Sequence, residues 1–241
     1  SKVRGKGYRL SSRLYLLDRN AILDGTRDEA RKKISSLEIF TSMASTNSYL
    51  LEQGLPAGSG SEQVFRICLS EMQHAGRGSR GRTWVSPFGH NIYLSISSGL
   101  PGGMKVMDGL SLVCGLAVLK TLRLFGIERL GLKWPNDVLI DDKKVAGILV
   151  EVNGELSGNF QVVIGIGINL KMPSGLMGGV DQPWSCLEER GFRPDLRNSL
   201  AGGLIREVMQ TFVQFAEHGL SHFGHELAKC DVTLEIGRAH V

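Results

Sequence analysis

The residues best suited to chemistry lie in one short segment, Gly76–Trp84, whose sequence is GRGSRGRTW. Three glycines and three arginines fall within seven residues, and a tryptophan follows them. Glycines let a backbone approach a ligand and turn its NH groups towards an anion, and arginines carry forked, permanently charged donors that match phosphate and carboxylate oxygens. The pattern predicts an anion clamp, and a solvated basic turn is the alternative.

Two segments downstream favour the clamp, KWPNDVLI from Lys133 and KVAGILVE from Lys144. They add two cations and, at a strand end fixed by a proline, Asn136 and Asp137. Such a cationic site with one carboxylate suits the attack of a carboxylic acid on the α-phosphate of ATP, because fixed cations screen the repulsion between the two anions. Taken alone, Lys144 is better explained as a hairpin lysine in water. The cations of the predicted site are Arg77, Arg80, Arg82, Lys133 and Lys144.

Other classes of site are excluded or disfavoured by the motifs. The chain has no GxxxxGK[ST] motif, so it is not a P-loop NTPase. Gly165 and Gly167 lack the third glycine of a dinucleotide fingerprint, and we expect them to thin a strand so that a flat ligand lies against its backbone. His218, His222 and His225 have no acidic or cysteine partner in register, so we expect no metal site formed by protein side chains alone.

The elements that must position these residues form an α+β pattern, a mixed sheet with helices on one face and the clamp at its edge. Gly5–Gly7 predicts a tight turn between two short strands, and one of Ser45, Thr46 and Asn47 caps a short helix. An amphipathic helix is predicted over Met104–Phe125. Further helices are expected near 184–190, 195–216 and 220–229. The predicted strands are 14–17, 37–40, 64–71, 91–98, 129–134, 138–140, 145–152 and 161–170, with turns at 24–26 and 141–143.

The totals describe a protein of 241 residues with enough apolar side chains, 42%, to fill a core. No apolar run is long enough to cross a bilayer, so we expect a cytoplasmic protein. Residues 1–13 carry +5 of the net charge of +4, which leaves −1 for the remainder. The basicity is therefore local, and only an N-terminal arm suits nucleic acid. The scattered spacing of the cysteines predicts reduced thiols at Cys68, Cys114, Cys186 and Cys230.

Five motifs occur in the same order and with similar gaps as in the biotin protein ligases. The chain resembles this family over roughly Leu37–Lys229, and the resemblance is greatest to the bifunctional type that is both ligase and repressor. The motifs are STN at 45–47, EMQHAGRGSRGRTWVSPFGHNIYLS from 71, KWPND from 133, KVAGILVE from 144 and GIGIN from 165.

The resemblance implies a class II synthetase-like fold and a two-step reaction. Biotin and ATP with Mg give biotinyl-5'-AMP, and biotin then passes to a lysine of the biotin carboxyl carrier protein of acetyl-CoA carboxylase. By motif position, catalysis falls to Lys144, Arg77 and Asp137. Biotin binding falls to Ser45, Thr46, Asn47, Gln73, Gly76, Arg77, Lys144, Gly147, Gly165 and Gly167. Binding of ATP and adenylate falls to Arg77, Gly78, Arg80, Arg82, Trp84, Lys133, Asn136 and Asn169.

The same resemblance divides the chain into three parts. Residues 1–19 are expected to be the wing remnant of a winged helix-turn-helix and a linker, and residues 20–229 the catalytic domain. Residues 230–241 are expected to begin an SH3-like barrel, although residues 236–241 also match what translation of a sequencing adapter would give. We expect a homodimer when adenylate is bound, operator DNA as a partner only of the full-length protein, and no membrane partner.

Two alternative functions and one departure from the family pattern remain. A lipoate ligase-like acyl transferase shares the implied architecture, and a non-catalytic, biotin-sensing repressor would keep the pocket without the reaction. Ser79 stands where relatives of the bifunctional type carry an arginine, which predicts faster release of the adenylate because one guanidinium near the phosphate is missing.

Overall fold

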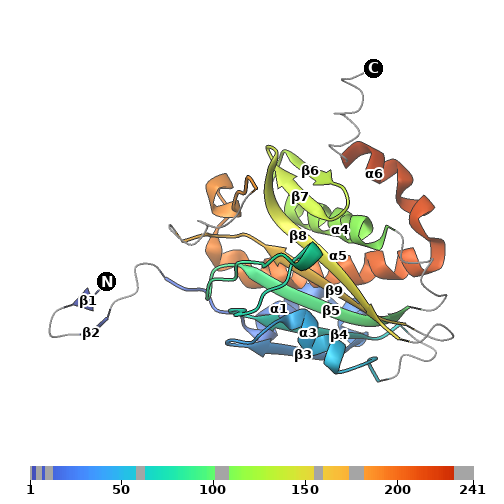
Figure 1. Ribbon diagram of the computed structural model, residues 1–241, viewed down its shortest axis with the longest axis horizontal. Coiled ribbons are helices and arrows are strands. Elements are labelled where there is room, and N and C mark those ends of the chain that lie inside the picture. Colours follow the sequence, from blue (N-terminus) through green and yellow to red (C-terminus); the bar gives the residue numbers. More distant parts are fainter. Residues whose placement is uncertain are drawn as a thin grey trace, which may run out of the picture.

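A mixed seven-stranded sheet lies at the centre of the protein, with helices on both of its faces (Figure 1). The two strands expected around Gly5–Gly7 are β1 (Lys2–Val3) and β2 (Gly7–Tyr8), which pair antiparallel in a separate two-stranded sheet. The turn that joins them falls outside the described part of the chain. The computed structural model describes residues 2–3, 7–8, 13–57, 63–100, 109–154, 160–173 and 182–230.

The central sheet is antiparallel except at one edge, where its first two strands in the chain run parallel. The two middle strands that pair in the longest ladder have almost wholly buried side chains. In spatial order the strands are β3 (Ile34–Phe40), β4 (Phe65–Ser70), β5 (Ile92–Leu100), β9 (Phe160–Ile168), β8 (Lys143–Asn153), β7 (Asp137–Ile140) and β6 (Leu130–Lys133).

Most of the helical mass covers one face of this sheet, and α3 lies on the other (Figure 1). The prediction of helices on one face therefore holds for the larger helices and misses α3. In the described part of the chain, besides the short 3-10 turns η1 (Ser79–Gly81), η3 (Leu187–Arg190), η4 (Pro194–Leu196) and η5 (Leu220–Phe223), the helices are α1 (Arg19–Thr26), α2 (Asp28–Lys32), α3 (Thr46–Glu52), α4 (Leu110–Leu124), α5 (Arg197–His218) and α6 (Gly224–Cys230).

Strand alternation divides each central strand between the two faces. In β9, Val162, Ile164, Ile166 and Ile168 belong to the core cluster under α4 and α5. Their neighbours turn to the α3 face, where Val163 packs with Leu50 and Cys68. Because Gly165 and Gly167 also turn to that face and carry no side chain, they leave a hollow in it.

Two expectations for the region before the sheet are wrong. Leu14–Leu17 is not a strand, because its backbone is bound by side chains of Glu71, Arg197 and Asn198 rather than by a neighbouring strand. The turn expected at Asp24–Thr26 is the last turn of α1, which buries Ile22, Leu23 and Thr26. Burial of that face against α5 outweighs the turn preference of Asp24–Gly25.

Two other segments were assigned correctly only in part. Of the helix expected over Met104–Phe125, the described portion is α4, in which Leu124 is 68% exposed rather than in the core. Residues 101–108 lie outside the described part of the chain. Of the helix expected near Trp184–Arg190, only η3 forms, because Trp184 instead makes a β-bridge with Lys144.

The four cysteines are free and buried, and burial raises the pKa of the thiols of Cys68, Cys114 and Cys186. Among the described helices, none is both long enough and apolar enough to cross a bilayer. Within the same residues, no group of three or more histidine, cysteine, aspartate and glutamate side chains is arranged to hold a metal ion.

Candidate active site

The hollow on the α3 face is an open cavity, and glycines form its floor. A Cβ built on Gly167 would lie 2.4 Å from Trp84 Cε2, and one on Gly147 would lie 2.9 Å from Trp84 Cζ3. A Cβ on Gly165 would lie 2.2 Å from Asn47 Oδ1. The three glycines predicted as pocket floor are therefore needed because Trp84 and Asn47 lie directly on the strands.

The same contacts correct the predicted position of the clamp. The segment 76–84 was expected at the edge of the sheet, but its Trp84 ring lies over the central strands β8 and β9. The segment closes on itself as a narrow loop, because Trp84 N donates to Gly76 O and Gly78 N donates to Arg82 O. Gly76 is required at the closure, since a Cβ there would lie 2.4 Å from Trp84 O.

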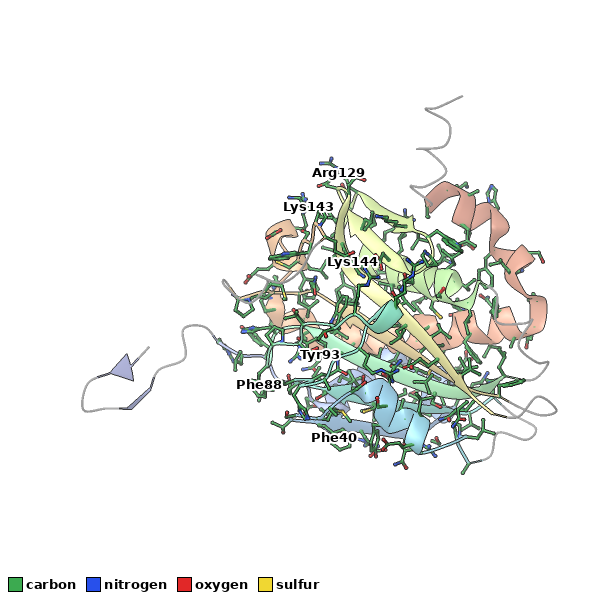
Figure 2. The ribbon with its side chains drawn as sticks, viewed as in Figure 1. Phe40, Phe88, Tyr93, Arg129, Lys143 and Lys144 are labelled. Carbon is green, nitrogen blue, oxygen red and sulfur yellow. The ribbon has the colours of Figure 1, made fainter. Side chains whose placement is uncertain are left out.

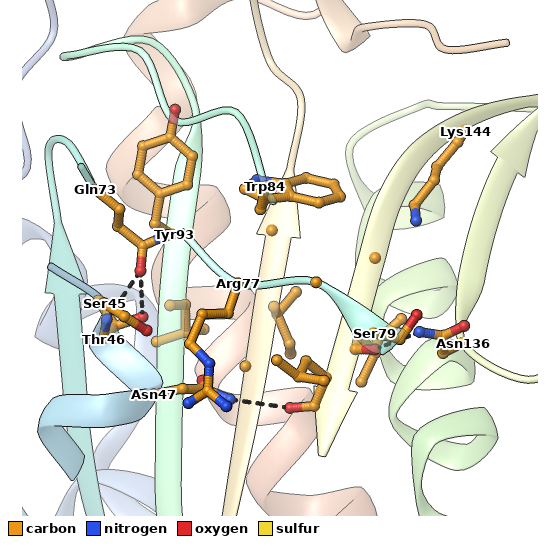
Figure 3. Close-up of a pocket in the computed structure, with 18 residues that line it drawn as sticks. Ser45, Thr46, Asn47, Gln73, Arg77, Ser79, Trp84, Tyr93, Asn136 and Lys144 are labelled. Carbon is orange, nitrogen blue, oxygen red and sulfur yellow. Dashed lines mark hydrogen bonds between the residues drawn. The ribbon is translucent and has the colours of Figure 1, made fainter. Parts of the chain in front are cut away.

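One wall of the cavity consists of amides and hydroxyls at the start of α3 (Figure 3). Ser45 is the N-cap and accepts a hydrogen bond from Ser48 N. Thr46 donates to Gln73 Oε1 through both its N, at 2.9 Å, and its Oγ1, at 3.1 Å. Asn47 Oδ1 accepts from Ser95 Oγ. The wall thus presents fixed donors and acceptors suited to a planar amide-like or ureido group.

Arg77 is the only arginine of the clamp that lines the cavity, among the described residues. Its Nη2 lies 2.6 Å from Glu151 Oε1, and its Nη1 donates to Ser48 Oγ at 3.2 Å. Glu151 also accepts from Asn47 Nδ2 through its other oxygen. The guanidinium therefore has a carboxylate partner that a ligand's anionic group can replace, since the side chain is 45% exposed.

Three predicted cations line neither this cavity nor the one beside it. Arg82 turns back on its own loop and donates through Nη2 to Ser79 Oγ at 2.9 Å. Arg80 occupies the left-handed region, with φ at 58°, inside η1. Lys133 is exposed at the end of β6. A role of these three in binding ATP stays a prediction.

Lys144 differs from its neighbour Lys143 in burial, because consecutive strand residues point to opposite faces (Figure 2). Lys143 is exposed, whereas Lys144 is 8% exposed and its Nζ lies 2.7 Å from Asp137 Oδ1. The Nζ also lies 5.4 Å from the centre of the Trp84 ring. A register shift between Val138 and Leu139 in the β7–β8 ladder accompanies this arrangement.

A second open cavity is also lined by Lys144. Asn169, predicted as a ligand of ribose or phosphate, lines this second cavity and donates to Ser185 O. Asn136 lines the first cavity instead and donates to Ile148 O. Lys144 and Trp84 line both cavities, so these two residues lie between them. The second cavity is lined by Thr83, Trp84, Val85, Lys144, Asn169, Met172, Gln182 and Trp184.

Two buried polar atoms of this region lack a hydrogen-bond partner among the described residues, Trp84 Nε1 and Asp137 Oδ1. The contact from Asp137 Oδ1 to Lys144 is an ion pair without hydrogen-bond geometry. Buried donors and acceptors left without partners are costly, and in native proteins they occur where a ligand or water completes the set. The arrangement fits a site that is finished by a bound polar molecule.

Three residues of the site were missed from the sequence. Tyr93 pairs with Gly167 across the β5–β9 ladder and lines the first cavity. Glu151 binds Arg77, and Trp184 lines the second cavity beside Lys144. Strand alternation could have found Tyr93 and Glu151. Tyr93 pairs with Gly167 across the ladder, and Glu151 lies at an even spacing from Gly147 in β8, so both side chains are on the same face as the floor glycines. No local pattern marks Trp184.

Comparison with known proteins agrees with this geometry. A family model described as "Biotin/lipoate A/B protein ligase family" matches residues 40–169. Over 229 residues the chain is 41% identical to the Bifunctional ligase/repressor BirA of Escherichia coli (strain K12). This alignment covers 95% of this chain and 68% of that protein. It is 34% identical over 189 residues to the Biotin--[acetyl-CoA-carboxylase] ligase of Mycobacterium tuberculosis, covering 74% of this chain and 65% of that one.

Among solved structures, the biotin protein ligase from Aquifex aeolicus in complex with biotin and ATP superposes with a TM-score of 0.65 and 26% identity. The match covers 82% of this chain and 79% of that chain. The family model spans more than half of the chain, and the relative from Escherichia coli is matched over most of its length at high identity. The chain belongs to the biotin/lipoate A/B protein ligase family.

Proposed function

We propose that the protein is a biotin protein ligase, which activates biotin with ATP and transfers it to a lysine of a carrier domain. In the first step a biotin carboxylate oxygen attacks the α-phosphorus of ATP, the bond to the bridging β-phosphate oxygen breaks, and pyrophosphate leaves. In the second step a lysine amine attacks the acyl carbon, and AMP leaves. A relative named as a biotin ligase, a relative named as a bifunctional ligase and repressor, and a solved relative with biotin and ATP support this assignment.

One observation carries the proposal, the position of Lys144 in the wall between two cavities. A carboxylic acid bound in the first cavity and a nucleotide bound in the second would meet at its ammonium. The two anions repel each other, and a buried cation at the point of contact offsets this repulsion and stabilises the charge that builds on the phosphate. Asp137 Oδ1 lies 2.7 Å from the ammonium and holds it in position.

The remaining residues hold the reactants in place. Thr46 and Gln73 present the donors and acceptors that a ureido ring requires, and the floor glycines let Trp84 and Asn47 lie close to the strands around the ring. Arg77 exchanges Glu151 for the carboxylate or phosphate of the ligand. Trp84 closes over the junction and excludes water, which protects a mixed anhydride from hydrolysis.

Several wider assignments belong to the same proposal. The acceptor is the biotin carboxyl carrier protein of acetyl-CoA carboxylase, in keeping with the name of the relative from Mycobacterium tuberculosis. Mg accompanies ATP, adenylate binding favours a homodimer, and repression of an operator is a further role, in keeping with the name of the relative from Escherichia coli. We place the reaction in the cytoplasm, because four free, buried thiols suit a reducing compartment.

The lipoate alternative is less well supported, although the family name covers both activities. Lipoate carries an apolar dithiolane ring, which forms no strong hydrogen bonds with the amide and hydroxyl groups of Thr46 and Gln73. The sensor alternative leaves the paired Lys144 and Asp137 without a purpose, because binding alone does not require a buried cation between two cavities.

Isothermal titration of biotin, with and without MgATP, tests the pocket, and radiolabelled ATP with a carrier domain tests the reaction. The protein should bind biotin and form biotinyl-AMP, and Lys144→Ala should bind biotin but form little adenylate. Lipoate in place of biotin should give no thermal shift. Biotin binding without any adenylate in the native protein would instead support the sensor alternative, and a shift with lipoate alone would support the acyl transferase.

A further inference from the structure

A buried ion pair outside the cavities, Arg197 with Glu71, touches three separate segments of the chain. Arg197 is 2% exposed and Glu71 is 4% exposed, and Arg197 Nη1 lies 2.7 Å from Glu71 Oε2. Leaving both charges out of water is expensive, and an apolar pair of similar volume would be at least as stable. A buried pair of this kind is therefore better explained by what it fixes in place than by stability.

The first segment that it fixes is Tyr15–Asp18, which leads from the β1–β2 hairpin to α1. Arg197 Nη1 donates to Tyr15 O at 2.9 Å, and Leu17 N donates to Glu71 Oε1. The neighbouring Asn198 completes the attachment, because its Nδ2 donates to Leu16 O and its Oδ1 accepts from Asp18 N. All four residues of this segment are thus held through their backbone.

The second and third segments lead to the two cavities. Glu71 begins the loop that carries Gln73, the partner of Thr46 in the wall of the first cavity. Arg197 also donates twice to Asn91 O, from Nε at 3.1 Å and Nη2 at 2.7 Å. Asn91 Oδ1 in turn accepts from Leu170 N and Lys171 N, directly after Asn169 of the second cavity.

We infer that Arg197 and Glu71 are positioning residues. They fix the loop that carries Gln73, on the biotin side, against residues 169–171, on the nucleotide side, and they tie both to residues 15–18. The inference rests on the proposed function for its ligands. Neither residue lines the first cavity, so both act through Gln73 and Asn91. Because linkage is reciprocal, ligands that order the two loops also hold residues 15–18 more firmly, and loosening the pair weakens both ligands together.

Hydrogen exchange of the substrate-free protein tests the arrangement without relying on any ligand. Arg197→Lys keeps the charge but loses the fork that reaches Tyr15, Glu71 and Asn91 at once. We expect exchange at the amides of Leu170 and Lys171, which Arg197 does not touch, to rise at least about fivefold. Asn198→Ala is the matched control, because Asn198 holds the same N-terminal segment without a hydrogen bond to Glu71 or Asn91. This variant should leave exchange at the amides of Leu170 and Lys171 unchanged. Equal exchange in Arg197→Lys and the native protein would overturn the inference.

Steady-state kinetics then separate positioning from stability. Glu71→Gln, which keeps an acceptor for Leu17 N, should raise the KM for both biotin and ATP roughly tenfold with a smaller change in kcat. With biotin and a non-hydrolysable ATP analogue, the amide of Leu17 should exchange more slowly in the native protein and not in Glu71→Gln. A lower melting temperature with both KM values unchanged would refute the inference. Absence of adenylate in the native protein would refute the proposed function instead, while the substrate-free exchange result would still stand.

Discussion

The floor of the first cavity leads to a sharp prediction for Gly167→Ala. The added Cβ would lie 2.4 Å from Trp84 Cε2 and 2.6 Å from both Cζ2 and Nε1. Ordinary contact begins at 3.4 Å, so the indole must move by at least 3.4 minus 2.4, or about 1 Å. The ring belongs to the clamp loop and lies beside Lys144, so the movement displaces the residues between the two cavities.

Such overpacking costs about 1–3 kcal/mol. If that cost falls on the bound state, biotin affinity drops between about 5- and 150-fold. Titration calorimetry of biotin measures the loss, and thermal unfolding measures the part that falls on the free protein. Gly224→Ala is the control, since a Cβ there has nothing within 4 Å and the residue is the first of α6. It should bind biotin as the native protein does and unfold at the same temperature or slightly higher.

A double-mutant cycle decides whether the indole is the cause. Trp84→Phe removes the fused ring that meets the new Cβ, so the double variant Gly167→Ala, Trp84→Phe should be more stable than the sum of the single effects predicts, by about 0.5–3 kcal/mol. Strict additivity would mean that the added methyl group does not meet the indole. Unchanged biotin affinity in Gly167→Ala would show that the cavity floor does not contact the ligand.

Three more outcomes follow from the site and its surroundings. Lys144→Met should lower the rate of adenylate formation by about 10²–10³-fold, whereas Lys143→Met on the opposite face should not change it, and pyrophosphate release measures both. Ser79→Arg should slow dissociation of the adenylate by about 10- to 150-fold, because it adds a charge-assisted hydrogen bond of about 1.5–3 kcal/mol at the cavity wall, and equal dissociation rates in a filter assay would contradict this. Burial, with Lys171 and Arg197 nearby, lowers the pKa of His90 in the folded protein. The unfolded state therefore binds more protons than the folded state, and the free energy of unfolding decreases as pH falls below about 6.5, the ordinary pKa of histidine. Thermal unfolding between pH 7 and 5 should show that decrease in the native protein, and a smaller one in His90→Gln.

The sequence predicts the elements better than it predicts which face they cover. The β5 strand follows from a period-2 apolar pattern and β9 from an almost wholly apolar run, and Ser45 is the N-cap, one of the three residues expected there. No such pattern predicts that Trp84 lies over the middle of the sheet, because its position depends on the space that the missing side chains of Gly147 and Gly167 leave. The empty space exists only once the two strands are paired.

The same limit applies to the residues that were missed or misplaced. Arg77 and Glu151 are separated by 74 positions, and their contact depends on strand register and on the path of a loop. Leu14–Leu17 has the composition of a strand, but long-range bonds to Glu71 and Arg197 decide its conformation. Local propensity cannot reveal partners that distant in the chain. The family resemblance predicts the ligands, and geometry assigns Asn136 to one cavity and Asn169 to the other.

The burial of all four cysteines makes the protein a convenient host for a single reporter group. A thiol reacts as its thiolate, and the raised pKa values of Cys68, Cys114 and Cys186 leave almost none of it near neutral pH. Cys230 is shielded by its own burial. A cysteine introduced at Leu16, which is 50% exposed, would therefore take up a maleimide dye selectively. Fluorescence of that dye would report directly on whether vitamin and nucleotide are sensed at residues 15–18.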